Sequence, residues 1–600
     1  MDLRTGIRAV AALLLGAAAA SLISCRPRLD EEDRAVGRSQ QKRLADEFRK
    51  QIALLSAAEK SLAAAGVPAP LPPNLSPWWQ STAAGSLFEN ASASQHSLED
   101  LYARALVHSQ QIRVFSDIPL IRHTGVQEAR GRFDTHLFVE SAYEYTDEPV
   151  GSILRTGRVA DRFKQYETRV EAGARKKLET GADVTLSQKI ARTTNNSQFF
   201  IPDHQASARL ALTVIQPLLR GGWTKYNRSF LHIAKIDSRI ARDEFIRQAE
   251  GHLLEITRAY WNLYLARALA VQKRKLLTDT DTLVGKLSKR RDLDAMASQL
   301  QRAKAASAKR RADLVRADMA IKNAEDRIRA LINDPNMPSG ASGELLPADT
   351  PNIQGPQIDL KQIAAAALEN RPEIRQAFLQ LKAAAVRKNI AKNELLPQLD
   401  LILETSIAGL DKAGRITDGW DDQWKGAHPG FLIGLRLDMP VENNVAKARL
   451  RRRKLEIRQQ ISQLRTTVDT VLLEAKISAR ELATSFREMQ TRHQSVAAAR
   501  EDVRILQQRW QSHAGARNKP ALGYIELLID AQDRLAEAEE DFARSTVIYN
   551  VAAVNLQRAQ GTLLKYEDLE VRRIKQEGPD ELRIEKVERP PLDANSATES

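Results

Sequence analysis

The amino-acid sequence predicts a mainly α-helical protein with a β-barrel part, built from a strand-and-long-helix unit that occurs twice. Helix-forming residues dominate the chain, and aromatic residues make up only 5% of it. Two proline-free stretches, 218–334 and 441–519, show the spacing of long amphipathic helices. Stretches of alternating polarity precede both of them, which is typical of strands. The 600 residues therefore do not divide into the roughly four ordinary domains that their number alone would indicate.

Residues 1–24 are typical of a secretory signal peptide of the lipoprotein type. Arg4 and Arg8 precede an apolar stretch, 9–20, that is too short to anchor the chain as a spanning helix. Residues 22–25 (LISC) resemble the lipobox of bacterial lipoproteins, in which the cysteine becomes the first mature residue and carries lipid such as palmitate. Cys25 is the chain's only cysteine, so the alternative is an incidental thiol, and an internal disulfide or cysteine-based zinc site is excluded.

A lipid on Cys25 predicts attachment to the outer membrane of a Gram-negative cell. Residue 26 is Arg rather than Asp, so the sequence does not resemble an inner-membrane retention signal. Export also removes the simplest explanation of the net charge of +14, which is nucleic-acid binding. The remainder of 25–96 is predicted to be a lipid-anchored arm, with an extended Pro-rich linker at 67–80. The charged, Pro-containing stretch 566–600 is predicted to be a disordered tail.

An internal repeat organises the rest of the chain. Residues 97–113 and 359–375 share a pattern of helical positions in one unbroken register. Each copy opens on a helix N-cap candidate, Ser97 or Asp359. We therefore expect a first repeat at 97–334, a linker at 335–357 that is rich in Pro and Gly, and a second repeat at 358–565.

Four stretches alternate strictly between apolar and polar residues and are predicted to be strands. They are 136–145, 209–215, 398–405 and 431–439. Such strands have one apolar and one wetted face, and the apolar face meets another sheet in a soluble sandwich or lipid in a membrane barrel. The segment 146–200 lies between the first two and is open to two interpretations, extra strands or an extracellular loop.

The two proline-free stretches are each predicted to be a long helix that turns back on itself. The turns are expected near 290–297 and 513–523, and the return helices near 298–333 and 524–563. At 1.5 Å per residue, about 60 residues give a rod of roughly 90 Å. Four strands cannot close a barrel, so either the strands are soluble or several chains share one barrel; three chains would give 12 strands.

Several motifs resemble TolC-type outer membrane efflux proteins. They are Gln216–Gly222 (QPLLRGG), Ala367–Ile374 (ALENRPEI), Leu395–Leu399 (LLPQL) and Ile529–Glu539 (IDAQDRLAEAE). The resemblance covers about 97–565 and implies a homotrimer with a 12-stranded barrel continued by a periplasmic α-helical barrel. It also implies a passive exit duct that docks onto a periplasmic adaptor and an inner-membrane pump. Such a protein is not an enzyme and needs no cofactor or metal.

The resemblance further implies a gate at the periplasmic helix turns of the second repeat. Trp510, Gly515, Arg517 and Asp530 match the family pattern there. The family's other aspartate is replaced by Leu527, with Glu526 one residue earlier, and a short insertion, 518–523, follows Arg517. We therefore take Trp510, Arg517, Glu526 and Asp530 as gate candidates; the alternative for Asp530 is a solvated helix residue.

In the turn of the first repeat, Asp292 stands where the family usually has glycine, which indicates a turn of different shape.

Two other classes of protein compete with the duct. A periplasmic coiled-coil adaptor or scaffold lipoprotein would also have hairpins and an anchor, but it would not repeat strands and rods twice. An envelope enzyme is disfavoured because no HExxH, GxSxG or P-loop motif occurs. The basic runs 309–311 and 451–454 are interpreted as solvated helix faces or helix–helix ion pairs rather than nucleic-acid contacts. The sequence does not identify the transported substrate, because a duct carries no substrate pocket.

Overall fold

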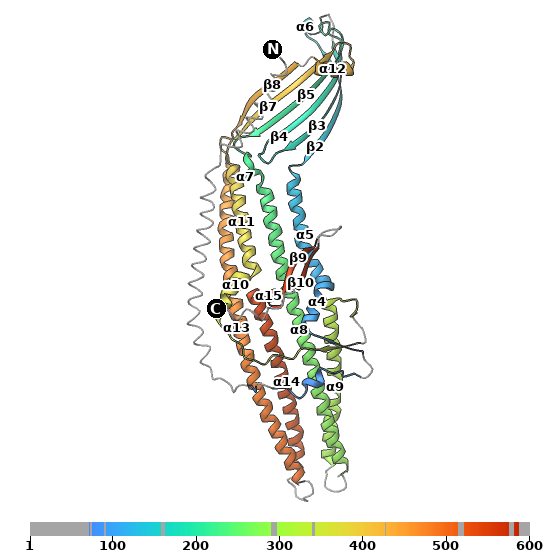
Figure 1. Cartoon of the computed structure of the whole chain (residues 1–600), viewed down its shortest axis with the longest axis vertical. Helices are drawn as coiled ribbons and strands as arrows, with labels where there is room; N and C mark the ends of the chain where they lie inside the picture. Colours follow the sequence, from blue (N-terminus) through green and yellow to red (C-terminus); the bar gives the residue numbers. More distant parts are fainter. Residues whose placement is uncertain are drawn as a thin grey trace, which may run out of the picture.

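The computed structural model shows an elongated molecule, with a twisted β-sheet at one end and long helices that run to the other (Figure 1). It describes residues 71–72, 75–88, 92–157, 162–289, 297–338, 343–425, 428–513, 521–574 and 581–586. The signal peptide, Cys25, Asp292, Gly515 and Arg517 lie outside these ranges. Within the described ranges, no helix combines the length and the apolar character needed to cross a membrane.

The pair of helices before the sheet occurs twice, with the same lengths and the same spacing. Helices α4 (Leu98–His108) and α5 (Gln110–Gly131) recur as α10 (Leu360–Asn370) and α11 (Pro372–Asn393), with all four boundaries in the register predicted from the sequence. The side chain of Ser97 accepts a hydrogen bond from the Asp100 N–H, and that of Asp359 accepts from Lys361 and Gln362. Both predicted N-caps are confirmed, and the same pair of helices precedes the strands in both halves of the chain.

The sheet contains six antiparallel strands in the order β2-β3-β4-β5-β7-β8. They are β2 (Thr135–Pro149), β3 (Arg162–Lys177), β4 (Asp183–Asn195), β5 (His204–Pro217), β7 (Gln398–Asp411) and β8 (His428–Asp438). The four predicted strands are present as β2, β5, β7 and β8 and are longer than expected. The expectation of four strands per chain is wrong, because the open segment 146–200 contributes β3 and β4. The prediction of a 12-stranded barrel assumed four strands in each of three chains, so it does not follow from a six-stranded sheet.

Two helical hairpins extend away from the sheet, as the sequence predicts. After the short α7 (Trp223–Asn227), the first hairpin is α8 (Ser229–Lys289) with α9 (Ala297–Ile332). The second is α13 (Asn444–His513) with α14 (Ala521–Gln560). Next to the sheet, α8 packs against α5 and α11, and α11 packs against α13. The four helices thus follow the order of the strands to which they connect, and α5 and α13 flank the layer.

Short elements form a band around the middle of the helices. Strand β1 (Ala93–His96) pairs in parallel with β6 (Glu344–Pro347), and α3 (Gln80–Ala83) packs on α8. After α15 (Leu563–Tyr566), strands β9 (Leu569–Ile574) and β10 (Glu581–Lys586) form an antiparallel hairpin near α4 and α5. These elements correct two expectations. The linker is not extended throughout, because residues 78–79 form a turn and α3 begins at Gln80. Within the predicted tail, 569–574 and 581–586 form two paired strands, and the apolar Ile584 is buried.

Two further short helices, α6 (Ile153–Thr156) and α12 (Ile416–Lys425), lie at the end of the sheet away from the long helices (Figure 1). The main hydrophobic core lies between α4, α8, α10, α13 and α14 in the middle of the molecule. Smaller clusters occupy the tips of the hairpins. The sheet thus lies at one end of the helical body, and the tips lie at the other.

Candidate transport conduit

The six-stranded sheet separates one apolar face from one charged face. The register places Leu137, Ala174, Leu186 and Leu212 side by side on one face, across four strands. The outermost apolar side chains are exposed, up to 82% for Leu137 and 83% for Phe431. The opposite face carries charged residues on every strand: Glu140, Glu144, Glu167, Arg169, Glu171, Lys189, Arg209, Glu404 and Arg436. A surface with this alternation fits lipid on one side and water on the other.

Both outer strands of the sheet are open. In the part of the chain that the structure describes, β2 pairs only with β3 and β8 pairs only with β7. These strands span 15 and 11 residues, and their apolar face is exposed at Val139, Ile433 and Leu435. A long, apolar open edge is a template for pairing with another chain. The sheet therefore has the form of an arc that further copies would complete.

Helix α12 covers part of the apolar face at the far end of the sheet. The Gln423 side chain hydrogen-bonds Gln188 on β4 at 2.9 Å. The helix approaches β7 so closely that a Cβ on Gly409 would lie within 2.4 Å of the Gly419 carbonyl oxygen, which explains a glycine at this position. Trp420 and Trp424 remain exposed, by 38% and 53%. Exposed tryptophans at the rim of an apolar face are typical of a membrane–water interface.

A belt of positive charge lies in the helical turns that adjoin the other end of the sheet. The belt comprises residues 120–132, 223–242, 380–393 and 444–460, which hold 19 Lys and Arg and 3 Asp and Glu. This surplus of 16 exceeds the net charge of +14 of the whole chain. Some of the charges are paired; Arg453 lies 2.7 Å from Glu456, and Arg449 lies 3.5 Å from Glu394. The basic run 451–454 is thus part of a belt beside the sheet.

The gate candidates that the structure describes, Trp510, Glu526 and Asp530, lie near the tips of the two hairpins and have different surroundings. Trp510 is buried among Leu283, Leu287, Leu300 and Ile529, so it packs the hairpins together. Glu526 on α14 forms an ion pair with Arg302 on α9.

Of the remaining candidates, Asp530 is exposed and has no ion-pair partner among the described residues, in keeping with either interpretation of it. Leu527 is half exposed. Arg517 lies outside the described residues.

The sequence interpretation missed the residue that locks the two hairpins together. Arg310 on α9 is 4% exposed and contacts Asp533 on α14 at 2.6 Å. It also donates to the Thr280 hydroxyl on α8 and to the Ile529 carbonyl oxygen at 3.3 Å. In the sequence it is one of three consecutive basic residues, and nothing in the run marks the middle one as buried. The interpretation of the run as helix–helix ion pairs is nonetheless confirmed for Arg310 and for Arg311, which lies 3.5 Å from Asp281.

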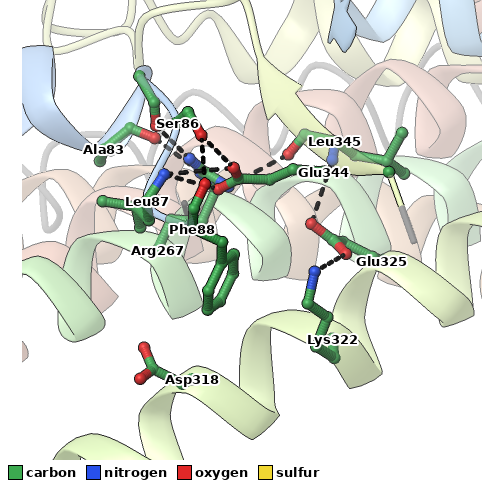
Figure 2. A network of polar contacts seen from close by, with 12 residues as sticks. Ala83, Ser86, Leu87, Phe88, Arg267, Asp318, Lys322, Glu325, Glu344 and Leu345 are labelled. Carbon is green, nitrogen blue, oxygen red and sulfur yellow. Dashed lines mark hydrogen bonds and ion pairs between the residues drawn. The ribbon is translucent and has the colours of Figure 1, made fainter. Parts of the chain in front are cut away.

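A fully buried ion pair fastens the N-terminal arm and the inter-repeat linker to the first repeat. Arg267 on α8 and Glu344 on β6 lie 2.7 Å apart, and neither side chain is exposed (Figure 2). Arg267 also donates to the carbonyl oxygens of Ala83 and Gly85, while Glu344 accepts from Ser86 and from the Leu87 N–H.

Burial would raise the pKa of Glu344, but these donors and the Arg267 charge outweigh it and lower that pKa. We call this cluster, Ala83–Leu87 with Arg267 and Glu344, the arm clamp.

A second charge cluster surrounds the buried Arg371 of the second repeat, and Glu250 of the first repeat lies close enough to feel its charges. Arg371, at the bend between α10 and α11, lies 2.5 Å from Glu474 and 3.1 Å from Glu373. Burial raises the pKa of the nearby Glu250 to about 7, and the Glu373 carboxylate adds to this effect. Burial and the Arg371 charge lower the pKa of Arg558. At the equivalent bend of the first repeat, Ser109 hydrogen-bonds His252 at 3.1 Å, and burial lowers the pKa of that imidazole.

Within the described residues, no group of three His, Cys, Asp or Glu side chains is placed to hold a metal ion. What the geometry provides is a curved wall with a lipid-compatible face, a wetted face and two open edges.

Solved outer-membrane channels share this architecture. The chain superposes on the outer-membrane channel OprN with a TM-score of 0.56 at 16% identity, over 77% of this chain and 89% of that one. It matches the Campylobacter jejuni CmeC outer membrane channel with a TM-score of 0.56 at 12% identity, over 83% and 95%. The open state of the Neisseria gonorrhoeae MtrE outer membrane channel matches with a TM-score of 0.53 at 16% identity, over 78% and 89%.

Neither a protein-family model nor a curated protein matches the sequence. The fold is therefore that of the outer-membrane channels, and the resemblance to TolC-type proteins is confirmed at the level of the fold.

Proposed function

We propose that this protein is the outer-membrane exit duct of a tripartite efflux or secretion system. In this proposal three copies form a homotrimer whose sheets cross the outer membrane and whose helices form a tube in the periplasm. The hairpin tips dock onto a periplasmic adaptor and an inner-membrane pump, which selects the cargo. The duct itself conducts passively and catalyses no reaction.

The observation that carries this proposal is the six-stranded sheet with one continuous apolar face and two open edges. In lipid, unpaired backbone groups at a sheet edge are too costly, so such a sheet is stable in a bilayer only when it closes into a barrel. Because α5, α8, α11 and α13 continue the strands in the same order, closing the sheet also closes the helices into a tube. An adaptor or scaffold lipoprotein has no need of this continuity, so we do not favour that alternative.

The charge belt and the tryptophans support this orientation. With the sheet in the bilayer, the belt lies at the level of the periplasmic phospholipid headgroups, where Lys and Arg are attracted to anionic lipid by about 1 kcal/mol each. Trp420 and Trp424 then lie at the opposite interface. A soluble sandwich would instead bury the apolar face of the sheet, which here is exposed.

We further propose that Cys25 carries the lipid anchor after removal of residues 1–24. The docked arm begins near residue 75, so about 50 residues separate it from Cys25. The clamp residue Arg267 lies 38 residues along α8 from Ser229 beside the sheet, which is about 57 Å at 1.5 Å per residue. Even a helical segment of 50 residues, about 75 Å long, would reach the membrane. An anchor on the periplasmic leaflet is therefore compatible with the position of the arm.

Extraction behaviour tests the proposal as a whole. We expect the protein to be released from outer membranes by detergent, and not by salt or urea, as a heat-modifiable trimer. The variant Cys25→Ala should lose acylation and still insert into the membrane. Release of a monomer without detergent, or a fully soluble Cys25→Ala protein, would contradict the duct and favour the scaffold alternative.

The gate is a separate part of the proposal. We propose that Arg517, Glu526, Asp530 and Trp510 form or support the periplasmic constriction, with Asp530 presenting three carboxylates to the lumen of the trimer. Asp530→Asn should then raise single-channel conductance in planar bilayers and weaken block by divalent cations, because a ring of carboxylates attracts cations. Glu501→Gln is the control, since Glu501 is an exposed carboxylate that pairs with Arg504 on its own helix, α13. Equal behaviour of the two variants would leave Asp530 as a solvated helix residue.

A further inference from the structure

We infer that the membrane section of this duct is an 18-stranded barrel, about as wide as its helical section, and that it passes hydrophilic cargo of correspondingly large cross-section. The inference rests on the trimer of the proposed function. It starts from the β3–β4 hairpin, which the first repeat has and the second lacks. The hairpin lies within the sheet, so closing the sheet must include it.

The hairpin is fully integrated into the sheet. Strand β3 pairs along the whole of β2, and β4 pairs with β3 and with β5 along nearly all of its length. Its side chains continue both faces: Tyr166, Val170 and Ile190 lie on the apolar face, while Glu171 and Lys189 lie on the charged face. A hairpin folded over the mouth of the duct as a loop would not keep this register or this alternation. Strands β2 and β5 are therefore separated by two strands and do not pair with each other.

The turn of the hairpin is fastened to the junction between β5 and α7. The Thr180 carbonyl oxygen accepts from the Trp223 N–H at 2.8 Å and from the Gln216 amide at 3.4 Å. Gly181 has a φ of +95° and packs so tightly that a Cβ would lie 2.5 Å from the Asn227 amide nitrogen. Glu179 pairs with Arg228 at 3.5 Å. The turn is thus part of the wall where sheet and helices meet.

Six strands match the width of the four helices beneath them. Strands about 4.8 Å apart and tilted by about 35–45° take up about 35–41 Å of circumference per chain. Four helices packed at about 8–10 Å take up about 32–40 Å. Four strands would take up only about 23–27 Å, so the tube would have to narrow on entering the membrane. The inserted hairpin removes this mismatch.

The predicted consequence is a wide, wetted passage. Three copies give 18 strands, a number at which barrels leave an aqueous channel. The same dimensions give about 34–39 Å between opposite backbones, compared with about 22–26 Å for 12 strands. The hairpin lines the added circumference with Glu167, Arg169, Glu171, Arg175 and Lys189, on the charged face. Such a wall suits large hydrophilic cargo and offers no apolar pocket.

Cysteine cross-linking between sheet edges tests the strand number directly. Leu435→Cys in β8 is combined in turn with Leu137→Cys, Val139→Cys and Ser141→Cys in β2, all on the apolar face. We expect oxidation of the membrane-embedded protein to give a covalent trimer in at least one combination. The matched control, Leu435→Cys with Leu186→Cys in β4, should give no inter-chain product, because β4 lies inside the sheet.

The outcomes separate this inference from the proposed function. A covalent dimer that never proceeds to a trimer, even when no free thiol remains, would mean that two chains close a 12-stranded barrel. A cross-link to β4 would mean that β2 and β3 lie outside the ring. Both outcomes overturn the inference and leave a duct in place. Absence of any inter-chain product, together with release of the protein without detergent, would overturn the duct itself. A covalent trimer supports both.

Labelling from outside the cell measures the width without passing the periplasmic tips. Thr213→Cys lies on the charged face of β5, and intact cells are treated with PEG–maleimides of increasing size. In the comparison variant, an Asn-Gly turn replaces residues 150–203, which joins β2 to β5 in a hairpin. We expect the diameter of the largest reactive polymer to fall by at least one third in this variant, because the backbone diameter falls by that fraction from 18 strands to 12 while the lining side chains keep their width. An unchanged limit in a variant that is inserted and trimeric would contradict the inference.

Discussion

The two repeats have the same helices before the sheet, but they differ in the strands between those helices and the hairpins and in the buried residues of the long helices. The first repeat inserts two strands between β2 and β5, whereas β7 and β8 of the second are neighbours. The equivalent contacts Ser109–His252 and Arg371–Glu474 align α8 with α13, so that position 252 corresponds to position 474. This alignment pairs the buried Arg267 with the buried Met489, and Glu250 with Leu472.

The differences occur where one repeat receives a segment from outside the unit. Arg267 binds the arm and the linker strand β6, which pack on the first repeat, while Met489 packs in an apolar core. On the second repeat the linker is held by neutral groups, with Asn550 bonded to the Asn352 backbone. The first repeat therefore accommodates the β3–β4 hairpin within its sheet. Its buried Arg267 lies where the N-terminal arm and the linker strand β6 pack against it.

The largest expected effect comes from breaking the arm clamp. Glu344→Gln leaves the fully buried Arg267 charge without its partner, which costs about 3–5 kcal/mol. We expect a lower melting temperature in detergent and faster proteolysis within residues 75–88. Replacing both partners with the apolar chemistry of the second repeat, as Arg267→Met with Glu344→Leu, should restore much of the thermal stability.

The double variant should nevertheless leave the arm sensitive to protease, because the carbonyl oxygens of Ala83 and Gly85 lose their donor. Asp418→Asn, which removes an exposed ion pair with Arg415, is the control and should change little. A double variant as unstable as Glu344→Gln would mean that the ion pair is not exchangeable for an apolar contact.

A change in pH should affect the two repeats differently through Glu250. Its folded pKa of about 7 lies above its ordinary value of 4.5, so the folded protein holds the proton more tightly. The stabilising contribution of the protonated carboxyl is therefore complete below about pH 4.5 and is lost as the pH rises through 7. The loss amounts to about 3 kcal/mol at pH 8. Glu250→Gln should raise the melting temperature at pH 8 and leave it unchanged at pH 4.5.

The exposed Glu255, paired with Arg258, is the control for this measurement. The lowered pKa of His252 acts in the opposite sense, since acidification below about 6.5 charges the unfolded imidazole first. Combining Glu250→Gln with His252→Gln therefore removes both contributions from α8. A pH dependence of stability that persists in this double variant would have to come from other groups, among them His232, Asp243 and Glu244 on the same helix, whose pKa values are also shifted.

The parts of the fold that could be predicted from the sequence are those set by residues close together in the chain. The hairpins and both N-caps were predictable because helical spacing and capping residues act within a few positions. Strands β2, β5, β7 and β8 were predictable because large apolar residues dominate one face of each strand. Strand β3 has Thr168, Ala172 and Ala174 on that face, so its alternation is weak, and its place in the sheet is set by neighbours more than by its own pattern.

The site was less accessible because its contacts join distant residues. The tip residues Trp510, Glu526 and Asp530 were found through a resemblance, but the partner of Glu526 is Arg302 in the other repeat. Arg267 is one of 90 Lys and Arg residues, and only the docked arm explains its burial. The position of the excess charge likewise became visible only when four separate segments were seen beside one end of the sheet.

A smaller effect is expected from the neutral attachment of the linker to the second repeat. Asn550→Ala removes the acceptor of the Asn352 N–H and the donor to the Asn352 carbonyl oxygen. Losing these part-buried hydrogen bonds costs about 1–2 kcal/mol, less than the arm clamp, because no charge is left behind. Thermal unfolding in detergent measures the difference. A loss equal to that of Glu344→Gln would mean that the two attachments are energetically alike, contrary to the comparison.

The smallest effect on stability should come from the ion pair that joins the repeats at their tips. Arg302 and Glu526 are 63% and 48% exposed, so removing either should change the unfolding free energy by less than about 1 kcal/mol. If the tips hold the duct closed, Arg302→Gln should still raise single-channel conductance, because it loosens α9 from α14. Glu526→Gln should raise conductance to a similar degree, since both variants break the same contact. Different conductances for the two variants would show that Glu526 acts on the lumen through its own charge rather than through the pair.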